Sequence, residues 1–145
     1  FFKQKTAYEI GVRLVGSEMC IRDRTPPLPD FSRFHKTFQA VPNVPGGRIR
    51  EAYFLAYDET KYEYIKRGEC KNAMETGREI VSASFVIPYP PGFPILVPGQ
   101  VLSQEILEFF IKLDVTEIHG YRDELGIRVF TNEALAEREK QLIKN

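Results

Sequence analysis

The clearest structural signal in the sequence is the stretch Pro88 Tyr89 Pro90 Pro91 Gly92 Phe93 Pro94 Ile95 Leu96 Val97 Pro98 Gly99 Gln100, which we name the Pro/Gly loop. It holds half of the ten prolines in the chain. Proline cannot donate a hydrogen bond to a sheet, so we expect the strand that ends at Ile87 to leave its sheet there. Gly92 and Gly99 permit the positive φ that two tight turns require. The loop should therefore be rigid before anything binds to it.

Three interpretations fit the residues of the Pro/Gly loop. The simplest is a structural corner, the second is a proline-rich ligand that presents Pro91 and Pro94 as a PxxP pair, and the third is the rigid wall of a binding site. Apart from Gln100 at its end, Tyr89 is the one polar side chain that the rigid loop holds. It either contacts a channel to an active site or packs against the domain.

The segments around the loop predict helices and strands. Residues 81–87 alternate at period two, which predicts a strand with four core-facing side chains, Val81, Ala83, Phe85 and Ile87. Residues 104–113 predict the best helix, with Ser103 as its N-cap, Leu102 and Leu107 placed as a hydrophobic staple, and a buried stripe of Ile106, Leu107, Phe110 and Leu113.

Weaker patterns predict the remaining elements. Helices are expected over residues 48–57 and 132–145, and the second of these is either exposed or docked on something absent from the chain. Strands are expected over residues 62–65 and 127–130. Gly68 should end the first of these strands, and a helical turn over residues 72–76 should follow and end at Gly77. The sequence therefore predicts a small α+β domain in which helices pack on a short mixed or antiparallel sheet.

The first 24 residues resemble translated sequencing-adapter DNA. Glu18 to Asp23 is what the codons GAG ATG TGT ATA AGA GAC of a transposon end encode, and Lys3 to Glu9 resembles a flow-cell primer. The alternative is a basic amphipathic targeting helix, but three acidic residues interrupt it and no small-residue cleavage site follows an apolar stretch. We therefore exclude residues 1–24 from the fold and predict that they contribute nothing to stability.

Residues 25–47 read as a Pro/Gly-rich linker with an aromatic middle. Five prolines and two glycines bracket Phe31, Phe34 and Phe38, which follow helical spacing. A free linker would not leave three phenylalanines in water. We therefore expect them to dock on a neighbouring domain that the chain lacks.

Composition bounds the function. The 145 residues include 20 basic and 20 acidic side chains, so a partner that binds mainly through phosphates is disfavoured, and we expect neither a nucleic-acid nor a membrane partner. No apolar run approaches the roughly 18 residues of a spanning helix. Two cysteines, Cys20 and Cys70, are too few for a disulfide framework, which favours a reducing, cytoplasmic setting, with Cys70 as an inert structural thiol.

The Pro/Gly loop, preceded by Gly77 Arg78 and a Ser-Ala strand, resembles the C-terminal domain of the Orn/Lys/Arg decarboxylases. Arg50 to Phe54 is similar to the Arg-Glu-Ala-Phe-Phe block of that domain, and Glu117 to Gly120 matches its end. The resemblance marks residues 48–131 as the family domain, which leaves the adapter-derived artefact over 1–24, the linker over 25–47 and a helix over 132–145. Gln100 departs from the family, which usually has Glu there, so a substrate-orienting or salt-bridge role of that carboxylate is in doubt.

The resemblance implies a parent enzyme of fold type I that uses pyridoxal phosphate, bound to a lysine of a separate upstream domain. The present chain would cover that catalytic domain, shape substrate access, support homo-oligomer contacts and bind no cofactor itself. The substrate-access residues would be seven members of the loop, namely Tyr89, Pro90, Pro91, Gly92, Pro98, Gly99 and Gln100. The alternative function is a stand-alone binding or assembly module that displays the proline-rich loop.

The remaining polar residues predict no catalytic or metal site. His35 Lys36 echoes the family's cofactor lysine, but position 33 is Arg and no phosphate-binding loop precedes it, so a solvated linker lysine is favoured. His119 is expected to cap a helix end on a carbonyl, and with His35 as the only other histidine there is no metal cluster. Arg78 is expected to bind a carbonyl or a carboxylate structurally. Three further acids, Glu105, Glu108 and Glu117, are expected to be solvated.

Overall fold

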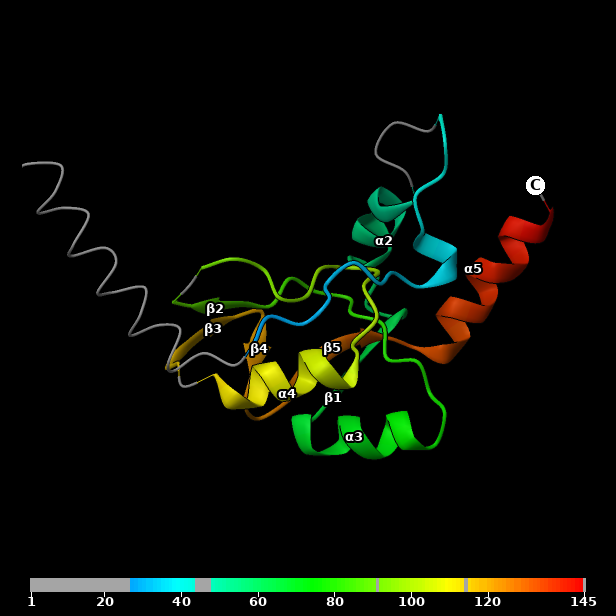
Figure 1. The fold of residues 1–145 in the computed structure, drawn as a ribbon. Helices are drawn as coiled ribbons and strands as arrows, with labels where there is room; N and C mark the ends of the chain where they lie inside the picture. The colour runs from blue at the N-terminus through cyan, green and yellow to red at the C-terminus, as the bar shows by residue number, and fades with distance from the viewer. Residues whose placement is uncertain (1–26, 44–47, 91, 114, 145) are drawn as a thin grey trace, which may run out of the picture.

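The computed structural model describes residues 27–43, 48–90, 92–113 and 115–144. The predictions made for residues 1–24 and for Pro91 therefore lie outside the described residues, and the division into domains stays a prediction. In chain order the described elements are (Figure 1) η1 (Lys36–Phe38), α2 (Ile49–Leu55), β1 (Tyr62–Ile65), α3 (Arg67–Glu75), β2 (Ile87–Tyr89), α4 (Gln104–Lys112), β3 (Glu117–His119), β4 (Tyr121–Arg122), β5 (Gly126–Phe130) and α5 (Asn132–Lys144).

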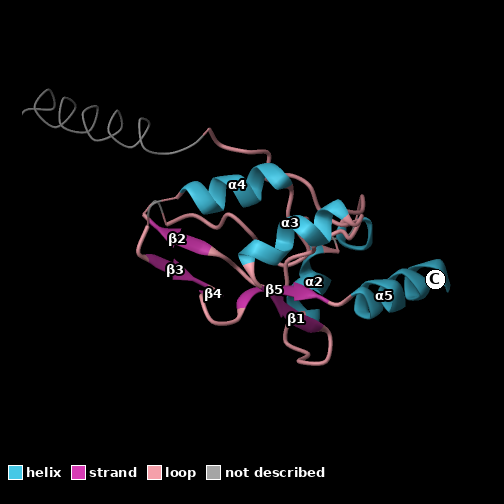
Figure 2. Ribbon diagram, turned by 90° about the horizontal axis from the view of Figure 1, so that it is seen from below, coloured by secondary structure: helices cyan, strands magenta, loops and turns pink. Residues whose placement is uncertain are grey.

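Strand β5 is the centre of the fold. It lies between β1 and β4 in a three-stranded antiparallel sheet, with Tyr62 opposite Phe130 and Ile65 opposite Ile127. Strands β2 and β3 form a separate antiparallel pair (Figure 2). Helices packed with small antiparallel sheets confirm the predicted α+β class.

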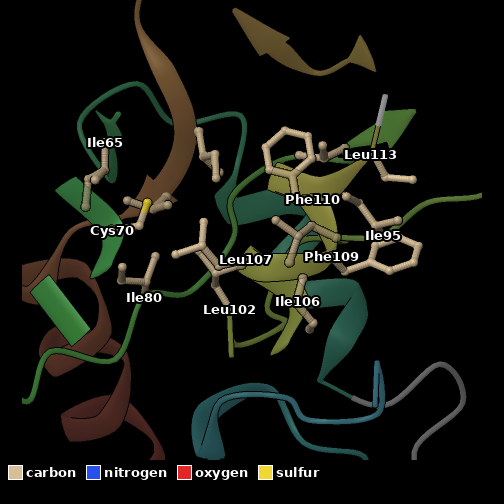
Figure 3. Packing of buried hydrophobic residues seen from close by; sticks show 14 residues of the cluster. Ile65, Cys70, Ile80, Ile95, Leu102, Ile106, Leu107, Phe109, Phe110 and Leu113 are labelled. Atoms are coloured by element: carbon tan, nitrogen blue, oxygen red, sulfur yellow. The ribbon is translucent and has the colours of Figure 1, made fainter. Parts of the chain in front are cut away.

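Two apolar clusters cover the two faces of β5. Ile127 and Val129 belong to the larger cluster, with the buried side chains of α4 and Cys70 of α3 (Figure 3). Phe130, which points to the opposite face because side chains alternate along a strand, belongs to a smaller cluster with Phe38 and Ala52. The sheet is thus sandwiched between α3 and α4 on one side and α2 and η1 on the other.

Helix α4 matches its prediction. The Ser103 hydroxyl accepts a hydrogen bond from the Ile106 backbone N–H at 3.2 Å, which satisfies one of the free donors of the first turn. The predicted stripe is buried, and Phe109 joins it at 2% exposure. The one-sided burial fixes this helix on the larger cluster.

Helix α5 has the predicted position but docks on the chain itself. Thr131 Oγ1 caps it by accepting from the Ala134 N–H at 3.1 Å, and Leu135 is buried in the smaller cluster. Glu139 accepts a hydrogen bond from Lys36 of η1 at 2.6 Å. The expectation that this helix is exposed or docked on something absent is therefore wrong for its first half.

Helix α3 begins earlier than predicted. Gly68 lies inside the first turn of the helix instead of separating the strand from a later helical turn. Nothing lies within 4 Å of a Cβ built there. Burial of Cys70 in the larger cluster holds this turn, so tertiary packing outweighs the low helix propensity of glycine. Gly77, with a φ of +87°, lies just after the helix as predicted.

The segment 81–87 does not keep the predicted alternation. Val81 and Ala83 are buried, but Phe85 is 42% exposed and Val86 is fully buried in its place. The Ser82 hydroxyl donates to the Ser84 carbonyl at 2.8 Å, and the chain bends there. A side chain that bonds its own backbone two residues on competes with the sheet, so the face of each later residue shifts by one.

Strand β2 includes Pro88, so the prediction that the chain leaves the sheet at Ile87 is wrong. Pro88 lies opposite Ile118 of β3 and is buried. An edge strand tolerates a proline wherever the missing N–H would face away from its partner. The sequence pattern alone did not indicate that this strand has a partner on only one side.

The phenylalanines of the predicted linker pack on this chain, which corrects the expectation that they dock elsewhere. Phe38 is fully buried in the smaller cluster, and Phe31 makes edge-on contacts with Phe93 and Phe109. Phe34 forms a β-bridge with Gln100. The segment is extended around Phe34, so helical spacing was not the relevant pattern.

Candidate functional site

The tip of the Pro/Gly loop is exposed and internally tied. The Tyr89 side chain is 59% exposed, and Pro90 follows it across a cis peptide bond. The Gly92 N–H donates to the Pro88 carbonyl at 2.8 Å, which closes the turn. A Cβ at Gly92 would lie 2.8 Å from the Tyr89 ring, and φ there is +82°, so the turn requires glycine.

The base of the loop is buried. Pro98 and Gly99 lie in the interior, and Gly99 has a φ of +89°. A Cβ at Gly99 would lie 2.9 Å from Cβ of Ala52 and 3.1 Å from Cβ of Phe38. The Gly99 N–H donates to the Ser82 carbonyl at 2.8 Å. Both glycines therefore adopt the positive φ that the sequence predicted.

Gln100 uses both ends of its amide inside the protein. Its Oε1 accepts from the Val97 N–H at 3.0 Å, and its Nε2 donates to the Phe31 carbonyl at 3.0 Å. The residue is 2% exposed. In this chain the group at position 100 fastens the loop to the segment that carries Phe31, and it points at no open surface.

The six predicted access residues that the structure describes therefore do not form one site. Tyr89, Pro90 and Gly92 lie at the exposed tip, whereas Pro98, Gly99 and Gln100 lie in the buried base. The Val86 N–H donates to the Leu96 carbonyl and the Ile95 N–H donates to the Val86 carbonyl, both at 2.9 Å, and these bonds join the two sides of the loop between tip and base. Of these residues only those at the tip are exposed, and their role in substrate access stays a prediction.

Two residues that the sequence analysis set aside lie beside Tyr89. Glu117 of β3 is directly opposite Tyr89, and His119 is opposite Ile87. Because paired residues and their second neighbours share a face, Tyr89, Glu117 and His119 lie on one side of the β2–β3 pair. His119 Nε2 is 3.1 Å from a Glu117 oxygen, and all three side chains are exposed. His119 therefore lies in a strand and pairs with a carboxylate, which corrects its expected place at a helix end. Strand pairing was the missing signal.

His35 and Lys36 serve the structure around η1. The His35 ring Nδ1 lies 2.8 Å from the Thr37 hydroxyl, and burial lowers the pKa of the imidazole, with the carboxylate of Glu79 opposing that shift. The Lys36 ammonium pairs with Glu139 at 2.6 Å. Lys36 is therefore exposed to solvent, as predicted, and it also forms an ion pair with α5.

Arg78 and Cys70 have structural surroundings. The Arg78 guanidinium donates to the carboxylate of Glu63 on β1, as the structural interpretation predicted. Cys70 is fully buried, and burial raises the pKa of its thiol to about 11, which fits the predicted structural thiol. Neither residue faces the loop tip.

The described ranges contain no group of three or more His, Cys, Asp or Glu side chains that could hold a metal ion. Glu105, Glu108 and Glu117 are exposed, as predicted. Over the same ranges no helix has both the length and the apolar character needed to cross a membrane. The candidate site is thus the loop tip together with the outer face of the β2–β3 pair.

Individual relatives of this chain are lysine decarboxylases. The constitutive lysine decarboxylase of Escherichia coli K12 is 40% identical over 60 aligned residues, which cover 32% of this chain and 8% of that protein. The crystal structure of the Francisella novicida lysine decarboxylase matches 58% of this chain and 13% of its own length, with 23% identity and a TM-score of 0.42. The structure of the E. coli constitutive lysine decarboxylase matches 57% of this chain and 15% of its own length, with 25% identity and a TM-score of 0.30. The chain thus spans a small fraction of each relative.

A family comparison covers the loop, its supporting strands and the helices on both sides of β5. The model of the Orn/Lys/Arg decarboxylase C-terminal domain matches residues 49–126, which is more than half of the chain. The match includes both glycine turns of the loop and the face that carries Tyr89 and Glu117. The chain therefore belongs to the family of Orn/Lys/Arg decarboxylase C-terminal domains.

Proposed function

We propose that the chain is the C-terminal part of a pyridoxal-phosphate-dependent carboxy-lyase that acts on ornithine, lysine or arginine. The family match over residues 49–126 supports this proposal, because it contains the whole Pro/Gly loop. The setting we propose is a cytoplasmic homo-oligomer in polyamine metabolism. A free, buried thiol at Cys70 fits a reducing compartment.

In this proposal the chain covers a catalytic domain of the same polypeptide, and the loop tip shapes substrate access. The observation that carries it is Tyr89, which is 59% exposed on a turn closed by the Gly92 to Pro88 hydrogen bond. The Glu117 carboxylate opposite it and the electron-rich face of the phenol both attract cations. A rigid surface of this kind can guide a substrate whose side chain is positively charged.

The described residues do not fit pyridoxal phosphate itself. That cofactor needs an anion cradle, a carboxylate for its ring nitrogen and a lysine in register with both. The Lys36 ammonium is already paired with Glu139, and the Ser103 hydroxyl already accepts from the first turn of α4. We therefore propose that the cofactor is bound by the catalytic domain and that this chain alone is inactive.

The parentage can be tested with the source DNA. An open reading frame that continues upstream of Thr25 into a cofactor-binding domain is expected. The polypeptide expressed from it should release carbon dioxide from at least one of L-ornithine, L-lysine and L-arginine, and only with pyridoxal phosphate. A frame that encodes no such domain, or a product inert on all three amino acids, would overturn the proposal.

The role of the tip can be tested in that longer enzyme. Replacing Tyr89 by Ala or Glu117 by Gln should raise KM several-fold with a smaller change in kcat, because the tip guides the substrate without reacting with it. Tyr64→Ala is the matched control, since Tyr64 is a 40% exposed tyrosine on β1, in the other sheet. Equal effects of the Tyr89 and Tyr64 substitutions would contradict the access role.

The proposed inactivity of this chain has its own test. Added pyridoxal phosphate should give weak borohydride-trapped labelling spread over several exposed lysines, without a defined visible absorption band. Stoichiometric labelling of Lys36, together with amine product from any of the three amino acids, would place the active site in this chain. It would overturn the proposal that a separate domain binds the cofactor.

A further inference from the structure

An aromatic hollow lies on the α2 side of the sheet, away from the loop tip. Its volume is about 280 Å³, and its main lining side chains are Tyr53, Tyr57, Tyr62, Phe85, Pro98 and Arg128. The bend at Ser84 brings Phe85 outward, so this ring borders the hollow at 42% exposure instead of entering the core. The hollow is distinct from the face that carries Tyr89.

Arg128 holds a positive charge in the hollow. Its Nε donates to the Ala83 carbonyl at 3.0 Å, and its guanidinium lies 4.6 Å from the centre of the Tyr62 ring. Arg128 forms no ion pair with any carboxylate of the described residues, whereas Arg78 and Arg138 each pair with one. The two terminal amino groups of Arg128 therefore remain for a ligand, and the stacked ring holds them in place.

The tyrosines add a hydrogen-bond donor. The hydroxyl groups of Tyr53 and Tyr57 lie 2.7 Å apart, so one donates to the other and a single hydroxyl hydrogen is left to point outward. Tyr53 also packs edge-on against Tyr57 and Phe85, with ring centres 5.3 Å and 6.1 Å apart. These mutual contacts restrict the rings before a ligand arrives, which lowers the entropy cost of binding.

We propose that this hollow docks a partner polypeptide that inserts one carboxylate side chain, flanked by apolar residues, onto Arg128. A guanidinium binds a carboxylate through two parallel hydrogen bonds, and the rings offer flat apolar surface on both sides. Exposed tyrosine together with arginine is the composition of energetically dominant interface positions. Glu59 also lines the hollow and repels a second negative charge, so the partner segment is singly acidic rather than polyacidic.

The test uses the full 145-residue chain and pools of capped heptapeptides. Each pool has Glu, Gln or Lys at the centre and equal mixtures of Ala, Leu, Phe and Pro at the six flanking positions. Nuclear magnetic resonance titration should show that the Glu pool shifts the backbone signals of α2 and β5 and the Arg128 Nε–H signal. The Gln pool should bind about ten-fold more weakly, because it cannot form a charge-assisted pair. The Lys pool should shift none of these signals.

Variants separate the hollow from the rest of the surface. Arg128→Gln should abolish the preference for Glu over Gln. Tyr57→Ala should weaken binding about five-fold or more while leaving the fold intact, because this side chain is 70% exposed. Arg122→Gln is the matched control in β4 and should bind as the unmodified chain does.

Four results would overturn the proposal. The first is equal or absent binding of the Glu and Gln pools. The second is benzoate binding as tightly as the Glu pool, which would make the hollow a small-molecule carboxylate site. The third is a dimer in sedimentation that Arg128→Gln dissociates, which would make a second copy the occupant. The fourth is loss of Glu-pool binding in a longer polypeptide with a catalytic domain, which would mean that this domain fills the hollow.

Discussion

The amide of Gln100 joins two segments that lie 69 positions apart in the sequence. It accepts from one backbone group and donates to another, and an ionised carboxylate can do only the first. The resemblance drew attention to this position as a departure from the family. The structure gives it a role within the fold, which sequence reasoning could not reach because the partner carbonyl of Phe31 belongs to the segment predicted to be a linker.

Gln100→Glu should destabilise the fold by about 1–3 kcal/mol at neutral pH, because the Phe31 carbonyl loses its donor and a charge is buried. Burial and that carbonyl favour the protonated form, so the introduced carboxyl has a folded-state pKa above the unfolded value of about 4.3. The loss of stability caused by Gln100→Glu should therefore be largest at neutral pH, where the carboxyl is ionised. It should shrink as the pH falls through the folded-state pKa toward the unfolded value. Urea unfolding at several pH values measures it. Gln39→Glu is the control, since Gln39 is exposed and donates only at 3.5 Å.

His35 should make stability depend on pH in the opposite sense. Burial lowers the folded-state pKa of this imidazole below its usual 6.5. Protonation therefore favours the unfolded chain, and the stability is fully present above that pH and is lost as the pH falls through the folded-state pKa. The comparison is His35→Asn, which keeps a capping side chain without a titrating group. As the pH falls from 8 to 5, the free energy of unfolding of the unmodified chain should fall relative to that of His35→Asn. A constant difference between the two would contradict this.

At the scale of elements, local patterns predicted what local contacts decide. Helices α2 and α4 and strands β1 and β5 lie where periodicity and capping placed them, because caps and alternation act within a few residues. The errors have distant causes. The bend at Ser84, Pro88 within β2 and the early start of α3 depend on which segments are paired or packed across the fold. The loop tip and base were predicted as one site for the same reason.

The base of the Pro/Gly loop offers a test of packing against backbone strain. Gly99 and Gly77 have nearly equal φ values of +89° and +87°, but a Cβ meets Ala52 and Phe38 only at Gly99. Both alanine substitutions should carry about 1–2 kcal/mol of left-handed strain. Gly99→Ala should cost about 1–3 kcal/mol more than that, because the side chain overpacks a filled cluster. Equal losses in thermal or urea unfolding would show that the base of the loop yields freely.

At the scale of the whole molecule, the described segments on either side of the family match complete the domain. Phe38 from the predicted linker and Leu135 from α5 lie in the same cluster as Ala52 and Phe130. The family model matches residues 49–126, so this cluster draws on residues before and after the match. The face of β5 that carries the smaller cluster is therefore covered by two segments that were expected to dock outside this chain.

Leu135→Ala should destabilise the chain by about 2–3 kcal/mol, because it leaves a cavity beside Phe38. Ile143→Ala provides the control, since Ile143 lies on the same helix and is 79% exposed. Its effect should stay within about 0.5 kcal/mol. Similar unfolding midpoints for the Leu135 variant and the unmodified chain would mean that α5 contributes no packing energy.

The position of β5 between two clusters also sets the rates at which backbone hydrogens exchange with solvent. Besides its pairing with β1 and β4, strand β5 is hydrogen-bonded to the segment 81–83. The Phe130 N–H donates to the Val81 carbonyl, and the Arg128 carbonyl accepts from the Ala83 N–H. The amides of β5 can open only when both faces separate, and their protection factors should report the global free energy of unfolding. Amides in the last turns of α5, beyond Leu135, should exchange through fraying long before them. Within residues 126–144, a deuterium pulse would thus label the C-terminal end first and the central strand last.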